Sequence, residues 1–243
     1  MKIGYTLSFG DLGTHVTNQV TYPLTYNIQQ DLQPVSLVFI GPSVVVTRGG
    51  MPGGNLKELL DWLRANPDKA TAGTGGVAGA EHLAGLMFQN VTGTRFQFIP
   101  YRGSGPAVQD MLSDQIDMIF GSPIVTLPHI QAGRLKAHAI MAKSRLATLP
   151  DVPTVDEAGA PGAYNLTWLS LWAPKGTPKN IIARLSSAVT AALADPAVKV
   201  RFAGMGGDVP PPDQQSPESL ATFHQAEINR WWPIIKAAGI KAE

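Results

Sequence analysis

The sequence predicts an α/β protein in which strands and helices alternate along the chain. Short apolar runs of strand length are followed by small residues and then by segments whose apolar residues recur at helical spacing. This order repeats over most of the 243 residues. Such alternation is typical of βαβ units, in which consecutive strands lie parallel. We therefore expect a largely parallel sheet covered by helices.

The expected strands are runs rich in β-branched and other apolar residues. They cover residues 5–9, 37–40, 44–47, 96–99, 116–120, 135–142 and 168–173. Gly41-Pro42 interrupts what would otherwise be a nearly continuous apolar run. A small-residue loop at 72–79 leads into a helix that carries Leu83, Leu86 and Met87 on one face.

The expected helices are marked by caps and by proline. Asn55 followed by Glu58 has the spacing of a helix start, and Asn66-Pro67 ends the leucine-rich helix that follows. Further helices are expected over residues 108–112 and 124–130. Others are expected to open at Thr177-Pro178, with apolar residues from Ile181 to Leu193, and at Asp195-Pro196 and Ser216-Pro217. Pro233 lies within the last helix and should kink or end it, because proline lacks a backbone donor.

Composition indicates a packed globular protein and excludes several classes of function. Hydrophobic residues make up 44% of the chain, and 19 Lys and Arg against 18 Asp and Glu leave a net charge of +1. No basic run predicts nucleic-acid binding, and no apolar run approaches the roughly 20 residues that span a bilayer. Cysteine is absent, which excludes disulfides and thiol nucleophiles. Residues Met1-Lys2-Ile3 do not open a signal peptide.

Two turns combine small residues with helix starts. Ser104 follows the run Ile99-Pro100-Tyr101, and Ser122 follows Ile119-Phe120-Gly121. Each serine stands where a helix N-cap belongs, and Pro123 takes a preferred first helical position. A helix start offers unpaired N–H groups and a partial positive charge, which favour an anion. Neither turn carries a catalytic group, so we expect an anion to be held there rather than transformed.

The glycine-rich loop 73–79 admits three interpretations. Its pattern Gly73-x-Gly75-x-x-Ala78 is a permitted form of a dinucleotide fingerprint, but no acidic residue follows about 20 residues on to bind a ribose. A tight structural turn and an anion-binding turn are the other two. We favour the anion-binding turn, with Gly73, Thr74 and Gly75 as its residues.

The remaining candidate residues have structural alternatives. His15 follows Thr14 in a polar turn and faces either a ligand or the protein's own groups. We favour an exposed side chain for Arg102 over a carboxylate contact, and core packing for Trp168 and Trp172 over an aromatic clamp. The five histidines show no metal-ligand spacing, and neither serine has the nucleophile elbow of a serine hydrolase. We expect no metal and no cofactor.

A series of short motifs runs in order along nearly the whole chain. They include Gly13-Thr14-His15, the loop 73–79, His82-Leu83-Ala84-Gly85, Tyr101-Arg102-Gly103-Ser104-Gly105-Pro106, Pro128-His129-Ile130-Gln131-Ala132-Gly133-Arg134 and Pro174-Lys175-Gly176-Thr177-Pro178. Together they resemble the extracytoplasmic solute receptors of the tripartite tricarboxylate transporters, the Bug-type receptors. Each motif is modest alone, and their common order is the strong signal.

The resemblance implies a periplasmic binding protein of the two-domain, type II Venus-flytrap fold. Such a receptor is not an enzyme: it captures a di- or tricarboxylate or an aromatic acid in an interdomain cleft and delivers it to the permease subunits of a membrane transporter. Domain I would comprise residues 1–43 and 139–243 and domain II residues 44–138, with hinges at 41–43 and 137–139. The expected ligand-binding residues are Thr14, His15, Gly73, Thr74, Gly75, Ser104 and Ser122.

One departure from the family pattern concerns the start of the chain. Family members begin with a strand, a loop that holds one ligand carboxylate and a helix, so at least one βαβ unit, on the order of 30 residues, is expected to be missing here. A truncated domain I would expose an apolar sheet edge, and we expect self-association or impaired binding as the result. Two other hypotheses are a nucleotide-dependent α/β enzyme built around the loop 73–79 and the effector half of a transcription regulator.

Overall fold

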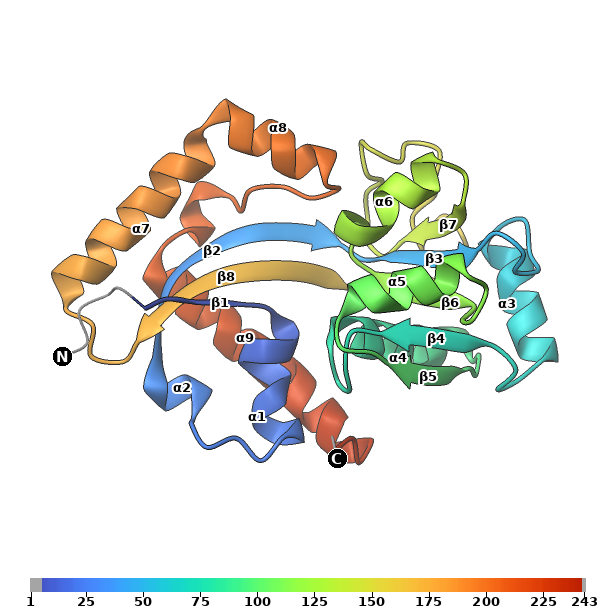
Figure 1. Ribbon diagram of the computed structural model, residues 1–243, viewed down its shortest axis with the longest axis horizontal. Helices are drawn as coiled ribbons and strands as arrows, with labels where there is room; N and C mark the ends of the chain where they lie inside the picture. The colour runs from blue at the N-terminus through green and yellow to red at the C-terminus, as the bar shows by residue number, and fades with distance from the viewer. Residues whose placement is uncertain (1–5, 242–243) are drawn as a thin grey trace. The chain divides into compact units, whose positions relative to one another are not determined.

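The computed structural model describes residues 6–241 and divides the chain into two compact units (Figure 1). Unit 1 comprises the described residues of Met1–Ile40, Trp168–Gly204 and Asp208–Glu243. Unit 2 comprises Gly41–Thr167 and Met205–Gly207. Each unit is built on its own sheet with helices packed against it, so the α/β class expected from the sequence is confirmed.

The sheet of unit 1 has the strand order β1-β8-β2. The strands are β1 (Ser8–Gly10), β2 (Leu32–Pro42) and β8 (Leu166–Pro174). β1 runs antiparallel to β8, with Ser8 opposite Trp172. The strand expected at 5–9 is found at Ser8–Gly10, so the two overlap at Ser8 and Phe9. Tyr5 lies outside the described residues.

The two faces of β8 pack against different helices, because alternate residues of a strand point to opposite sides. Leu171 and Ala173 face Ile182 of α7, whereas Trp168 lies against Phe223 of α9. The helical segments of unit 1 are η1 (a π-helix, Gly13–Thr17), α1 (Asn18–Thr21), α2 (Ile28–Asp31), α7 (Lys179–Ala194), α8 (Pro196–Gly204), η2 (Pro212–Gln214) and α9 (Pro217–Ala237).

The long helix α9 continues past Pro233 to Ala237, so of the two expected outcomes, a kink or an end, the helix does not end at this proline. Trp231 before the proline and Ile235 after it are both buried, so the helix packs against the core on either side of Pro233. This packing offsets the loss of the backbone hydrogen bond that proline cannot donate. Among the described residues no single helix is long and apolar enough to cross a membrane. Within the same residues, α7 and α8 taken together have the length and apolar composition of a membrane-spanning segment, but the two helices are bent by 72° relative to each other.

The sheet of unit 2 has the strand order β5-β4-β6-β3-β7. Its strands are β3 (Val44–Arg48), β4 (Thr71–Thr74), β5 (Gln97–Pro100), β6 (Met118–Gly121) and β7 (Leu135–Ile140). β4 runs parallel to β5 and β6, but β3 runs antiparallel to β6 and β7. The expectation of a largely parallel sheet therefore holds for only half of it, because an apolar run fixes a strand but not its direction.

Four helices cover this second sheet: α3 (Leu56–Ala65), α4 (Ala80–Thr92), α5 (Ser104–Leu112) and α6 (Pro123–Gln131). α3 begins as expected, since the Asn55 side chain accepts the Glu58 N–H at 3.0 Å. Its buried leucines join an aromatic core in which the rings of Phe88 and Phe96 both contact that of Phe120. The strand–turn–helix units of this half position the turns considered next.

The return of the chain to unit 1 falls later than the hinge expected at residues 137–139. Those residues lie inside β7, which pairs with β3. The following segment stays in unit 2 because its backbone bonds to β7: the Ile140 N–H donates to Pro153 O at 2.8 Å, and the Val155 N–H donates to Ile140 O at 2.9 Å. Residues 139–167, expected in domain I, therefore pack with unit 2.

Candidate functional site

The turns that the sequence singled out in unit 2 lie at one edge of its sheet (Figure 1). β5, β4 and β6 are parallel neighbours, so their carboxyl ends, which lead to α5, α4 and α6, share that edge. Two backbone hydrogen bonds join the first two turns. The Tyr101 N–H donates to Thr74 O at 2.8 Å, and the Gly103 N–H donates to Gly75 O at 3.2 Å. The carboxyl ends of parallel strands are where open α/β sheets bind ligands.

Gly73 and Thr74 shape the turn after β4. A Cβ on Gly73 would lie 2.4 Å from Cδ1 of Ile116 and 3.1 Å from Cβ of Ala107, so only glycine lets this strand pack so closely. Thr74 is buried, and its hydroxyl donates to Gly76 O at 3.1 Å. Both residues serve the turn itself in this structure, and their contact with a ligand stays a prediction.

Ser104 is the first residue of α5 and not its N-cap, so the expected capping role is wrong. The N-cap is Gly103, whose φ of 109° is a conformation that glycine adopts without strain. Glycine thus ends the extended loop one residue earlier than expected. The Ser104 hydroxyl therefore does not cap the helix, and it donates a hydrogen bond to Oε1 of Glu81.

Glu81 is the residue of this cluster that sequence reasoning missed. It lies in the first turn of α4, and its Oε2 accepts the Gly75 N–H at 3.3 Å. A Cβ on Gly121 would lie 3.7 Å from Cγ of Glu81, which places Glu81 beside the turn after β6 as well. An acidic residue in the first turn of a helix complements the helix dipole. An acidic residue just after the glycine-rich loop 73–79 was therefore a signal that the sequence contained.

Ser122 is the N-cap of α6, as expected. Its Oγ accepts the Ile124 N–H at 3.3 Å, and Pro123 occupies the first helical position. By contrast, α4 and α5 begin at Gly79 and Gly103, which offer no side-chain cap. The N–H groups in the first turns of α4 and α5 are therefore available to an acceptor from outside the chain, such as a carboxylate oxygen.

Thr14 and His15 lie in unit 1, in η1. The exposed Thr14 donates its N–H and its hydroxyl to Oδ1 of Asp11, at 2.8 and 2.7 Å. His15 is only 4% exposed, and its ring centroid lies 5.4 Å from that of Trp172. Burial above all, and then the charge of His224, lower the pKa of His15 to about 4, so its ring is neutral at pH 7. The structure thus places His15 among the protein's own groups.

Three further residues have the structural surroundings that the sequence favoured. Arg102 is exposed, and Trp168 and Trp172 are both buried. The indole N–H of Trp168 donates to Oε2 of Glu227 at 3.1 Å, and that of Trp172 donates to the Ser170 hydroxyl at 2.8 Å. These two tryptophans are core residues whose indole N–H groups have partners within the protein, as the sequence favoured.

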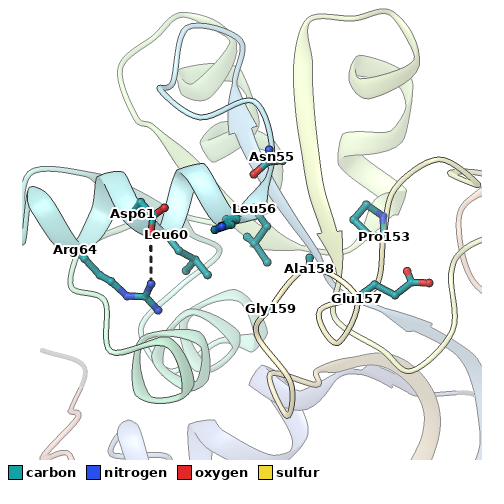
Figure 2. Close-up of a pocket in the computed structure, with 10 residues that line it drawn as sticks. Asn55, Leu56, Leu60, Asp61, Arg64, Pro153, Glu157, Ala158 and Gly159 are labelled. Carbon is teal, nitrogen blue, oxygen red and sulfur yellow. Dashed lines mark ion pairs between the residues drawn. The ribbon is translucent and has the colours of Figure 1, made fainter.

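A separate pocket of unit 2, about 610 Å³ in volume, lies between α3 and the loop at 153–159 (Figure 2). Leu56 and Leu60 contribute its apolar lining, and Arg64 and Asp61 pair with each other at 3.6 Å. It contains none of the residues in the turns after β4, β5 and β6. This surface hollow is therefore distinct from the turn cluster that the sequence predicted.

Together, the two α/β units and the helix starts at one edge of the unit 2 sheet are features of a solute-binding receptor. A family model for the tripartite tricarboxylate transporter family receptor, TctC, matches residues 2–240. The chain belongs to this family of solute-binding receptors. Sequence resemblance to the Bug-type receptors is thereby confirmed, and a nucleotide-dependent enzyme is excluded.

Named relatives support the same assignment. BugT of Bordetella pertussis is 33% identical over 242 residues, which cover 98% of this chain and 73% of BugT. The malate-bound structure of MatC from Rhodopseudomonas palustris is 33% identical, with a TM-score of 0.87 over 95% of this chain and 79% of MatC. The periplasmic binding protein BugD is 32% identical, with a TM-score of 0.91 over 100% of this chain and 81% of BugD.

Proposed function

We propose that this receptor captures a small carboxylate in the periplasm and delivers it to the permease subunits of a tripartite transporter. Membership of the receptor family supports the transport role, and MatC, a similar protein, was solved with malate bound. BugD, which is similar over the whole chain, is a periplasmic binding protein. We also propose that the chain self-associates through β1, the edge strand of the unit 1 sheet.

The observation that carries the proposal is the set of three helix starts at one edge of the unit 2 sheet. α4 and α5 begin without a side-chain cap, and their turns are joined by backbone hydrogen bonds. Uncapped helix starts donate N–H groups to an anion and add the favourable field of the helix dipole. We propose that the ligand's carboxylate binds at the start of α5, near Ser104, with Gly75 and Ser122 at the sides of the site.

Isothermal titration against mono-, di- and tricarboxylates and aromatic acids tests this function. The replacement Ser104→Ala removes a hydroxyl at the centre of the cluster, and we expect it to weaken binding by about 0.5–3 kcal/mol, as for one hydrogen bond to a charged group. Ser113→Ala at the exposed other end of the same helix is the matched control and should leave affinity unchanged. Absence of binding to every acid by the folded protein would contradict the function, and equal effects of both replacements would contradict the site.

A further inference from the structure

The donors expected for a ligand in unit 2 already hold a carboxylate of the chain itself. Oε2 of Glu81 accepts the Gly75 N–H at 3.3 Å, and Oε1 accepts the Ser104 hydroxyl. These two contacts come from the turns after β4 and β5, and Gly121 of the third turn is also close to the Glu81 side chain. Glu81 therefore lies at the meeting point of the three turns.

The carboxylate of Glu81 is balanced by neutral donors only. Among the other partly buried acidic residues, Asp117 pairs with Arg48 at 2.9 Å and Glu227 pairs with Arg230 at 4.0 Å. Asp11 and Asp110, like Glu81, are held by neutral donors. None of the ion pairs within residues 6–241 involves Glu81. Its side chain is half-buried, which reduces the screening of its charge by water. A ligand at the turns thus meets a negative charge that lacks a counter-charge.

We propose that Glu81 makes this receptor select small carboxylates that carry a hydrogen-bond donor next to the carboxylate, an ammonium group most strongly. The inference rests on the proposed function and deepens it by naming the ligand class. A bare second carboxylate at Glu81 would meet a like charge, whereas an ammonium would form a charge-assisted hydrogen bond with it. A hydroxyl would also donate to Glu81, but without the opposite charge.

The geometry of the turns matches the head group of an α-amino acid. In such a ligand one carbon atom carries both the carboxylate and the ammonium group. The uncapped start of α5 can bind the carboxylate, and Ser104 at that start contacts Glu81 directly. One head group can therefore reach donors of the helix start and the Glu81 acceptor together, because the two lie side by side.

Paired ligands that differ only in the donor test this selectivity. We would titrate succinate, malate and aspartate, followed by glutarate with glutamate and adipate with 2-aminoadipate, into the wild-type chain and the Glu81→Gln variant. For the chain length that binds most tightly, we expect the amino member to bind about 10- to 100-fold more tightly than its bare partner. Malate should fall between aspartate and succinate. In Glu81→Gln this preference should disappear, with succinate binding more tightly and aspartate more weakly than in the wild type.

A matched control is available in the same unit. Glu58 also lies in the first turn of a helix and accepts a glycine N–H, that of Gly54, at 2.6 Å, but it is exposed and away from the turn cluster. Glu58→Gln should keep the wild-type preference. If Glu81→Gln does not fold, by circular dichroism, Glu81→Ala provides the same test without the amide.

The failure of this inference can be told from failure of the proposed function. Binding with the same amino preference in wild type and Glu81→Gln overturns the selectivity and leaves carboxylate capture intact. A receptor that binds only bare carboxylates, such as succinate or benzoate, also overturns it. If neither protein binds any of these acids, the proposed function fails, and the selectivity fails with it.

Discussion

Acid should destabilise unit 1 through His15, and the size of the effect follows from its surroundings. Burial and the neighbouring His224 lower the pKa of His15 from 6.5 to about 4. Between these two pH values the unfolded chain binds a proton at His15 that the folded chain excludes. The free energy of unfolding therefore keeps its full contribution from neutral His15 above pH 6.5 and loses it as the pH falls toward 4. At about 1.4 kcal/mol per pH unit, the loss from His15 is about 2 kcal/mol at pH 5 and about 3 kcal/mol in full.

Urea unfolding followed by tryptophan fluorescence can measure this loss. Four of the five tryptophans lie in unit 1, and replacing Trp62 of α3 by phenylalanine confines the signal to that unit. We expect His15→Gln to remove about 2 kcal/mol of the difference in unfolding free energy between pH 7.5 and pH 5, because glutamine does not titrate. His129→Gln in unit 2 is the control for the replacement itself. An equal pH dependence in the His15 variant and the wild type would refute the reasoning.

Two further predictions concern unit 1. Gly10→Ala should destabilise the chain by about 1–3 kcal/mol, because the new Cβ would fall 1.7 Å from Nδ1 of the buried His15; Gly204→Ala, whose Cβ would meet nothing within 4 Å, should show no such loss in parallel urea titrations. Phe9, 57% exposed on the edge strand β1, should promote self-association, so Phe9→Asp should shift the sedimentation profile of a concentration series toward monomer. An unchanged profile would argue against association through this edge.

Local sequence signals predicted the elements of the fold better than their arrangement. Asn55 and Ser122 cap their helices as the sequence indicates, since a cap depends only on residues within one turn. The antiparallel direction of β3 was not predictable, because strand direction depends on connections made through the whole unit. Ser104 was predicted to be the N-cap of α5 but is the first residue of the helix, because Gly103 adopts the cap conformation without a side chain.

The candidate site residues could likewise be predicted only where the signal lies within a short stretch of sequence. The sequence brought the turns at 73–75, Ser104 and Ser122 into consideration, and the parallel strands do place them at one edge. Glu81 was missed because its partner Ser104 lies 23 residues away along the chain, so the contact exists only once β4 and β5 are paired. The burial of His15 likewise depends on Trp172 and His224, which reach it from distant segments.

The most direct test of the central claim is to map the ligand onto the protein by amide chemical shifts. The carboxylate that binds most tightly in the titrations would be added to isotopically labelled chain until saturation. We expect the largest shifts on the amides of Gly75, Ser104 and Gly105, with smaller shifts near Ser122. Saturable binding whose shifts cluster instead around Leu56 and the pocket beside α3, with the turn amides unmoved, would contradict it.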